Sequence, residues 1–218
     1  MYKRQAYYTL DNHYIESVWH LLKTILDKGL IYQDYKVVPY DPRIGATLSS
    51  HEVAQGYRET VDPSVTVRFT LLDDSAAFLV WTTTPWTLPA NLALAVGEDI
   101  DYVFVEHAGE NLILAKARLE SVLGETPARI LRTVKGRDLV GLRYQRLFDY
   151  PEAPGDICRV LAADFVSTED GTGIVHVAPA SGVDDLARGQ AHALPVVHGV
   201  GLDAGAYTPL TLQTTPYG

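Results

Sequence analysis

Two stretches of the sequence concentrate side chains that could bind or activate a small molecule. The first reads WTTTPWTLPAN over residues 81–91, with three consecutive threonines between an apolar run and a proline. Threonine suits a strand and proline commonly ends one, so an ordinary strand end is one interpretation. The other is a cluster of hydroxyls that leaves a sheet and hydrogen-bonds a sugar, a phosphate or a water molecule.

The second stretch reads DGTGIVHVAPASGVDD over residues 170–185. Its first four residues predict a turn before a strand and do not form a dinucleotide fingerprint, which needs a further glycine and a helix directly after it. His176 lies in or just after that strand, where a lone histidine is more often structural than catalytic. Asp184 and Asp185 fall in the first turn of a predicted helix, where carboxylates suit the helix dipole. Taken alone, each residue has a structural explanation.

Composition limits the classes of protein to which the chain can belong. The 218 residues are 47% hydrophobic and 21% charged, as in an ordinary globular protein. The formal charge of −9 argues against tight binding of RNA by this chain alone, and we expect no DNA partner. No apolar run approaches the ~20 residues that cross a bilayer, so no membrane partner is expected. A single cysteine, Cys158, excludes an internal disulfide and fits a cytoplasmic location.

Hydrophobic periodicity predicts the elements that would position these residues. A helix is expected over residues 11–29, begun by Asp11 and stopped by Gly29. A short strand at 35–40 and a polar loop at 41–62 should follow. Further strands are predicted at 65–71, 78–81, 92–96, 102–105, 112–115, 129–134, 158–162 and 173–177, with short helices at 117–123 and 183–193. Many short strands with few helices predict a mainly β, α+β domain that is closed or barrel-like, with helices on its rim.

The two stretches together resemble motifs of one protein family. WTTTPWTLPAN resembles the threonine-rich motif in the editing domain of isoleucyl-tRNA synthetases, and GTGIVHVAPASGVDD resembles the second editing motif of that family. Thr84 before Pro85 and Trp86 after it favour the isoleucyl branch, because valyl and leucyl relatives carry arginine and an acidic residue there. YIESVW, DKGLIYQDYKVVPYDPR, LSSHEVAQGY and DPSVTVRF resemble the stretch that leads from the synthetic domain into this insertion.

The resemblance covers about residues 6–200 and implies a domain organisation. Residues 1–61 would be part of the synthetic, Rossmann-type domain and a connecting segment, residues 62–200 the editing domain, and residues 201–218 a truncated tail. Residues 1–5 and 208–218 have no obvious role, so we expect the chain to be a piece of a longer protein.

The resemblance also implies roles for individual residues. Thr82, Thr83, Thr84 and Asn91 match positions around the terminal adenosine and the ester of charged tRNA. Asp185 matches the aspartate that binds the substrate's α-ammonium group, and at a helix N-terminus we expect it to be ionised at neutral pH. The three threonines and Asp185 are the predicted catalytic residues.

A second set is predicted to bind the substrate without catalysing the reaction. His176 matches a residue that helps to shape the amino-acid pocket, and Trp86 and Thr87 are expected to line this pocket. Asn91 belongs to the same set through its expected contact with the adenosine. Asp184 matches a position where relatives tolerate other residues, so it receives no role.

Two departures from the family pattern restrict the activity. Asp41 and Ile44 replace the thiolates of a Cys-Pro-Arg-Cys sequence that is common in relatives, so we predict no zinc site. The two ATP-binding signatures of class I synthetases are missing, so this chain should not charge tRNA. Editing needs no cofactor, whereas the full-length parent would use ATP and magnesium. The expected partners are the 3′ end of tRNA(Ile) carrying valine and the rest of the synthetase.

Two alternatives remain open from the sequence. One is a stand-alone hydrolase with Ser181, His176 and Asp185 as a triad, although Ser181 lacks the G-x-S-x-G setting. The other is a non-catalytic remnant that only docks tRNA or another protein.

Overall fold

The computed structural model describes residues 8–124, 127–149 and 151–205. The chain divides into two compact units, Met1–Lys36 and Val37–Gly218, called here the N-terminal unit and the main unit. The predicted domain boundary between residues 61 and 62 stays a prediction.

The N-terminal unit contains one helix, α1 (Asn12–Asp27), among its described residues. Asp11 is the N-cap residue, as predicted, but its side chain makes no capping hydrogen bond. Gly29, with a φ of +69°, donates to the Leu26 carbonyl at 2.8 Å, and Leu30 donates to the Ile25 carbonyl at 3.2 Å. These two bonds form a Schellman motif, so the predicted glycine stop is confirmed.

The main unit begins with a small hairpin, β1 (Tyr40–Asp41) paired with β2 (Ala46–Thr47). The predicted strand at 35–40 is therefore wrong over residues 35–39, because this segment pairs with no strand among the residues that the structure describes. The predicted loop at 41–62 also contains α2 (Ser50–Gln55), a short helix stabilised by a capping box.

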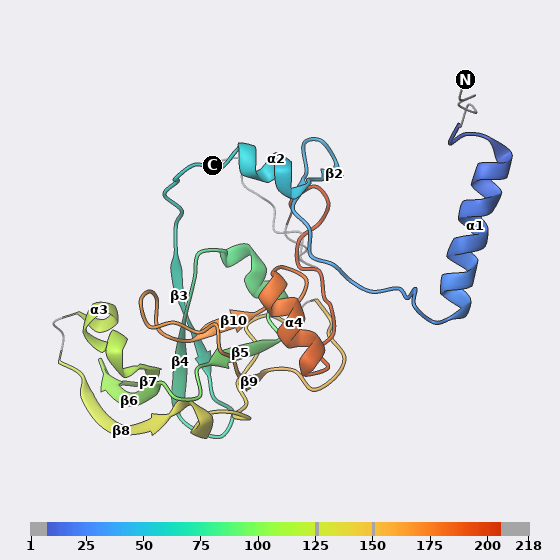
Figure 1. Cartoon of the computed structure of the whole chain (residues 1–218). Helices are drawn as coiled ribbons and strands as arrows, with labels where there is room; N and C mark the ends of the chain where they lie inside the picture. The colour runs from blue at the N-terminus through green and yellow to red at the C-terminus, as the bar shows by residue number, and fades with distance from the viewer. Residues whose placement is uncertain (1–7, 125–126, 150, 206–218) are drawn as a thin grey trace. The chain divides into compact units, whose positions relative to one another are not determined.

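Most of the main unit is built on two larger sheets (Figure 1). The first has the order β3-β4-β7-β6-β8, in which only the β4–β7 pair is parallel. Its strands are β3 (Val65–Thr70), β4 (Ala76–Thr82), β6 (Asp101–His107), β7 (Glu110–Ala115) and β8 (Arg129–Lys135). The second sheet places β5 (Ala93–Val96) between an antiparallel β10 (Val175–Val177) and a parallel β9 (Arg159–Ala162).

Short helices connect or cover these strands. A 3₁₀ helix, η1 (Pro85–Ala90), joins β4 to β5, and α4 (Val183–Ala191) follows β10. The predicted helix at 117–123 is divided into η2 (Lys116–Arg118) and α3 (Leu119–Leu123), and η3 (Gly136–Asp138) follows β8.

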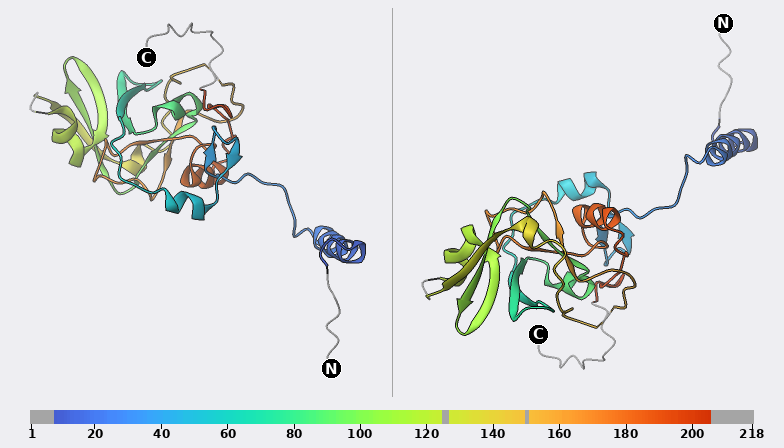
Figure 2. Two further views of the ribbon diagram at one scale, coloured as in Figure 1. Left: turned by 90° about the horizontal axis from the view of Figure 1, so that it is seen from above. Right: turned by 90° about the horizontal axis from the view of Figure 1, so that it is seen from below.

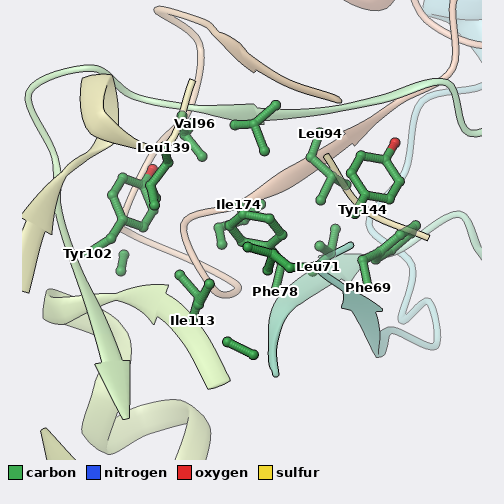
Figure 3. Packing of buried hydrophobic residues seen from close by; sticks show 14 of the residues in the cluster. Phe69, Leu71, Phe78, Leu94, Val96, Tyr102, Ile113, Leu139, Tyr144 and Ile174 are labelled. Carbon is green, nitrogen blue, oxygen red and sulfur yellow. The ribbon is translucent and has the colours of Figure 1, made fainter. Parts of the chain in front are cut away.

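The main hydrophobic core lies between the two sheets (Figure 3). Phe69, Phe78 and Ile113 of the first sheet pack with Leu94 and Val96 of the second, as strand alternation requires. The opposite face of the first sheet is covered by α3 (Figure 2). The buried residues on this face are Leu79, Val103, Val105, Leu112 and Leu114.

The predicted α+β class is confirmed, and the region from Val65 to Val177 is mainly β. The expected closed form of this β domain is wrong, because the sheets do not close into a barrel within the described part of the chain. The two stretches that could do chemistry nevertheless meet at β5, because β10 pairs with it and η1 leads into it.

Candidate active site

The threonine-rich stretch folds into a turn held by its own hydroxyls. Thr82 is the last residue of β4, and its Oγ1 accepts the backbone N–H of Thr84 at 3.1 Å. Thr84 Oγ1 lies 3.2 Å from both Thr82 Oγ1 and Thr87 Oγ1. Thr87 Oγ1 also donates to the Thr84 carbonyl at 2.7 Å. These bonds connect the end of β4 at Thr82 to the start of η1 at Pro85. The strand-end interpretation is therefore confirmed, and the binding of a sugar, a phosphate or a water molecule by these hydroxyls stays a prediction.

A single hydrogen bond joins this turn to the second stretch. Thr87 Oγ1 lies 2.9 Å from His176 Nε2, although the two residues are 89 positions apart in the sequence. Both side chains are buried, with 7% and 6% of their surface exposed. His176 is in β10, opposite Leu94 of β5, and its hydrogen bond to Thr87 places its ring against η1.

The direction of this bond follows from the number of available protons. Thr87 has one hydroxyl hydrogen, which the contact with the Thr84 carbonyl occupies. His176 therefore donates through Nε2–H, and its buried Nδ1 remains an acceptor without a partner among the described residues. Burial lowers the pKa of His176 to about 4, so the ring is neutral at neutral pH. The site thus presents an uncharged imidazole beside a row of hydroxyls.

Asp185 is held at the start of α4. Its Oδ2 accepts the backbone N–H of Ala178 at 2.9 Å, which ties the carboxylate to the residue that follows β10. Burial raises the pKa of Asp185, the Ala178 amide lowers it and Asp184 raises it further. Burial therefore changes the pKa of Asp185 more than the helix terminus, which was expected to lower this pKa. The Asp185 carboxylate is thus held at Ala178, which lies two residues beyond His176 along the chain.

A second junction joins the two stretches away from the threonines. Gly171 has a φ of +64°, and a Cβ at this position would come within 2.7 Å of Trp81 Cε3. A larger residue would be both strained and too close to the indole ring. Arg118 fixes the same turn by donating Nε–H to the Gly171 carbonyl at 2.9 Å and an Nη1 hydrogen to the Glu169 carbonyl at 2.8 Å.

The other predicted site residues are distributed differently. Thr83 is exposed, and Trp86 has 52% of its surface exposed. Asn91 is only 2% exposed: its Oδ1 accepts the Tyr144 hydroxyl at 2.6 Å, and its Nδ2 donates to the Ala93 carbonyl at 2.9 Å. The structure thus joins Thr82, Thr84, Thr87 and His176 directly and holds Asn91 inside the fold. The assigned roles toward the substrate stay predictions.

Nothing in the sequence pattern singles out Arg118 or Tyr144. Each contacts its motif from a segment about 50 residues away, and neither lies in a recognisable pattern. Only the folded structure reveals these contacts.

The geometry argues against a Ser-His-Asp triad. A triad needs one histidine nitrogen on the serine and the other on the aspartate. Here His176 Nε2 bonds Thr87, and Asp185 Oδ2 accepts the Ala178 amide. Ser181 is exposed, and its backbone N–H donates to the Ala178 carbonyl.

The segment that replaces Cys-Pro-Arg-Cys forms the turn between β1 and β2. Asp41 Oδ1 accepts the Arg43 N–H at 2.8 Å, and Ile44 is 69% exposed. Across the described ranges, no group of three or more His, Cys, Asp and Glu side chains is arranged to hold a metal. In the same ranges, no helix has the length and apolar character to span a membrane.

Comparison with known proteins identifies the family. Residues 2–177 match the family described as tRNA synthetases class I (I, L, M and V). The chain belongs to this class I tRNA synthetase family.

The relatives of this class I chain include isoleucine--tRNA ligases. It is 46% identical to that of Picrophilus torridus over 202 residues, which are 92% of this chain and 20% of the relative. It is 49% identical to that of Thermus thermophilus over 199 residues, which are 88% of this chain and 19% of the relative. The predicted resemblance is confirmed, and the chain spans about a fifth of the length of these relatives.

A solved structure shares the fold of this class I chain. It is titled "The crystal structure of GlLeuRS-CP1" and aligns with a TM-score of 0.50 at 17% identity. The alignment covers 59% of each chain. At this identity the likeness describes the fold alone.

Proposed function

We propose that the main unit carries the editing site of an isoleucyl-tRNA synthetase, which hydrolyses valine wrongly attached to tRNA(Ile). The observation that carries the proposal is the Thr87–His176 hydrogen bond, which joins the two motif-like stretches in one buried network. Asp185 supplies the carboxylate that an aminoacyl ester needs, and this carboxylate accepts the backbone N–H of Ala178, two residues beyond His176.

Magnitudes explain why such a site is needed. One methylene is worth only about 1–3 kcal/mol in a hydrophobic pocket, and discrimination between isoleucine and valine by this synthetase is the established example of that limit. A second pocket that admits valine and excludes isoleucine supplies the remaining selectivity.

The chemistry assigned to this site is hydrolysis of an ester. A water molecule attacks the carbonyl carbon, the bond from that carbon to the ribose oxygen breaks, and the ribose oxygen leaves with a proton. The products are free valine and uncharged tRNA. Because the ester is already activated, positioning supplies most of the catalysis and no covalent nucleophile is required.

Each side chain has a part in this positioning. Asp185 holds the α-ammonium group, and the threonine hydroxyls place the adenosine and the attacking water. His176 limits the size of the amino-acid side chain, with Trp86 beside it. Because the His176 ring is neutral, it adds no positive charge that would repel the ammonium group.

The parent protein is proposed to ligate isoleucine to tRNA(Ile) in the cytoplasm, using ATP and magnesium at a site outside this chain. The rest of the synthetase would bind the body of the tRNA, because the charge of −9 does not favour phosphate binding here.

The test measures valine release from valyl-tRNA(Ile) by the 218-residue chain. The same assay is run on a chimera in which the chain replaces the matching 199 residues of the Thermus thermophilus relative. We expect hydrolysis of valyl-tRNA and not of isoleucyl-tRNA. Absence of hydrolysis by both proteins would overturn the proposal in favour of a docking role.

A matched pair of variants separates editing from a serine hydrolase. Ser181→Ala should release valine at the parental rate, whereas Asp185→Asn should lose most of the activity. Loss of activity in Ser181→Ala would support the triad instead.

A further inference from the structure

Both the oxygen and the nitrogen of the Asn91 side-chain amide form hydrogen bonds within the protein. The Tyr144 hydroxyl donates to Oδ1 at 2.6 Å, and Nδ2 donates to the Ala93 carbonyl at 2.9 Å. With 2% of its surface exposed, Asn91 offers little to a ligand. Its position at the end of WTTTPWTLPAN therefore calls for an explanation other than direct contact with the adenosine.

Tyr144 is a rigid support for this asparagine. It is 1% exposed, and its ring packs edge-on against Phe69 with centroids 5.2 Å apart at 88°. Its backbone N–H donates to the Cys158 carbonyl at 3.1 Å. Burial raises the pKa of Tyr144 well above 10, so the hydroxyl keeps the proton that it donates. Figure 3 shows this ring at the opposite end of the core from Tyr102.

Asn91 in turn closes the 3₁₀ helix that carries the site. Its backbone N–H donates to the Leu88 carbonyl at 3.0 Å, at the C-terminal end of η1. Thr87 lies in the middle of η1 and bonds both Thr84 and His176. A shift at Asn91 would therefore move Thr87 relative to His176.

We propose that Tyr144 is a positioning residue for editing: its hydroxyl fixes Asn91 and thereby keeps Thr87 in register with Thr84 and His176. The proposal rests on the editing function above. It assigns Asn91 to the support of the site, not to substrate contact.

The first test is amide hydrogen exchange in the 218-residue chain. Tyr144→Phe keeps the ring but removes the donor to Asn91. Tyr102→Phe is the matched control, because it removes a buried hydroxyl from the same core that donates to the Gly173 carbonyl at 2.7 Å. Exchange at the Thr87 and Asn91 amides should rise about tenfold in Tyr144→Phe and much less in Tyr102→Phe. Equal rises in both variants would overturn the proposal.

The second test measures valyl-tRNA(Ile) hydrolysis by the chimera described above. Tyr144→Phe should lower kcat about tenfold with KM within about twofold. If Tyr144 acts through Asn91, the double variant Asn91→Leu/Tyr144→Phe should be no slower than Asn91→Leu alone. Additive losses, or a parental kcat in Tyr144→Phe, would overturn the inference.

The two tests separate the inference from the function on which it rests. If the parental protein releases no valine, the proposed editing function fails, and the exchange experiment alone decides whether Tyr144 positions Thr87.

Discussion

Replacing Thr87 by valine removes the hydroxyl that joins the two halves of the site. Valine keeps the branched shape, so the change leaves little cavity. The Thr84 carbonyl still accepts the backbone N–H of residue 87 at 3.0 Å. His176 loses the partner of its Nε2–H at 2.9 Å and keeps none, because Nδ1 already lacks one in the described structure. The main consequence is a buried imidazole with no hydrogen bond.

The expected loss of stability follows from that unpaired donor. A buried polar group left without its partner costs about 1–3 kcal/mol. For a domain of this size, that corresponds to a fall in Tm of about 2–12 °C. The freed ring should also define the pocket less sharply, so the preference for valyl- over isoleucyl-tRNA should fall.

Chemical denaturation gives the free energy of unfolding, and deacylation of both tRNAs gives the selectivity. Thr66→Val is the control, because Thr66 is an exposed threonine on β3. Its free energy of unfolding should stay within about 0.5 kcal/mol of the parental value. If Thr87→Val changes stability no more than this control and leaves selectivity unaltered, the hydrogen bond does not hold the site together.

Three further predictions concern Asp185 and His176. Asp185→Asn keeps an acceptor for the Ala178 amide but removes the charge, so kcat/KM for valyl-tRNA should fall about 10- to 150-fold in steady-state assays, since a charge-assisted contact is worth about 1.5–3 kcal/mol. His176→Ala should retain some valine release and begin to hydrolyse isoleucyl-tRNA; an equal fall in both rates would exclude His176 from size selection. The pKa of His176 is about 4 in the folded state and about 6.5 in the unfolded chain, so between these pH values only the unfolded chain binds a proton at His176. The free energy of unfolding should therefore fall by about 3 kcal/mol as the pH drops through this range. Urea unfolding should show a smaller fall in His176→Gln.

The sequence was most informative where local pattern decides structure. Alternating residues from Val65 predicted β3, and the apolar run before the threonines predicted β4. Gly29 predicted the end of α1 through its left-handed conformation. The strand predicted over residues 35–39 does not form, because β-branched and aromatic residues form a strand only where a partner strand pairs with them.

The site was predicted less completely, because its contacts connect distant segments. Motif resemblance pointed to the threonines and His176, but periodicity carries no information that Thr87 bonds His176 or that Tyr144 holds Asn91. For Asp185, the helix terminus was visible in the sequence, but the burial that raises its pKa depends on the folded packing.

In the proposed editing site, both motif-like stretches bind one aminoacyl ester. The most direct measurement titrates the isotope-labelled chain with a non-hydrolysable amide analogue of 3′-valyl-adenosine and follows backbone NMR shifts. We predict that the amides of Thr83 and Thr87 and those of Ala178 and Asp185 shift together and saturate at one concentration. Shifts confined to one stretch, or different saturation points for the two, would contradict a single editing site.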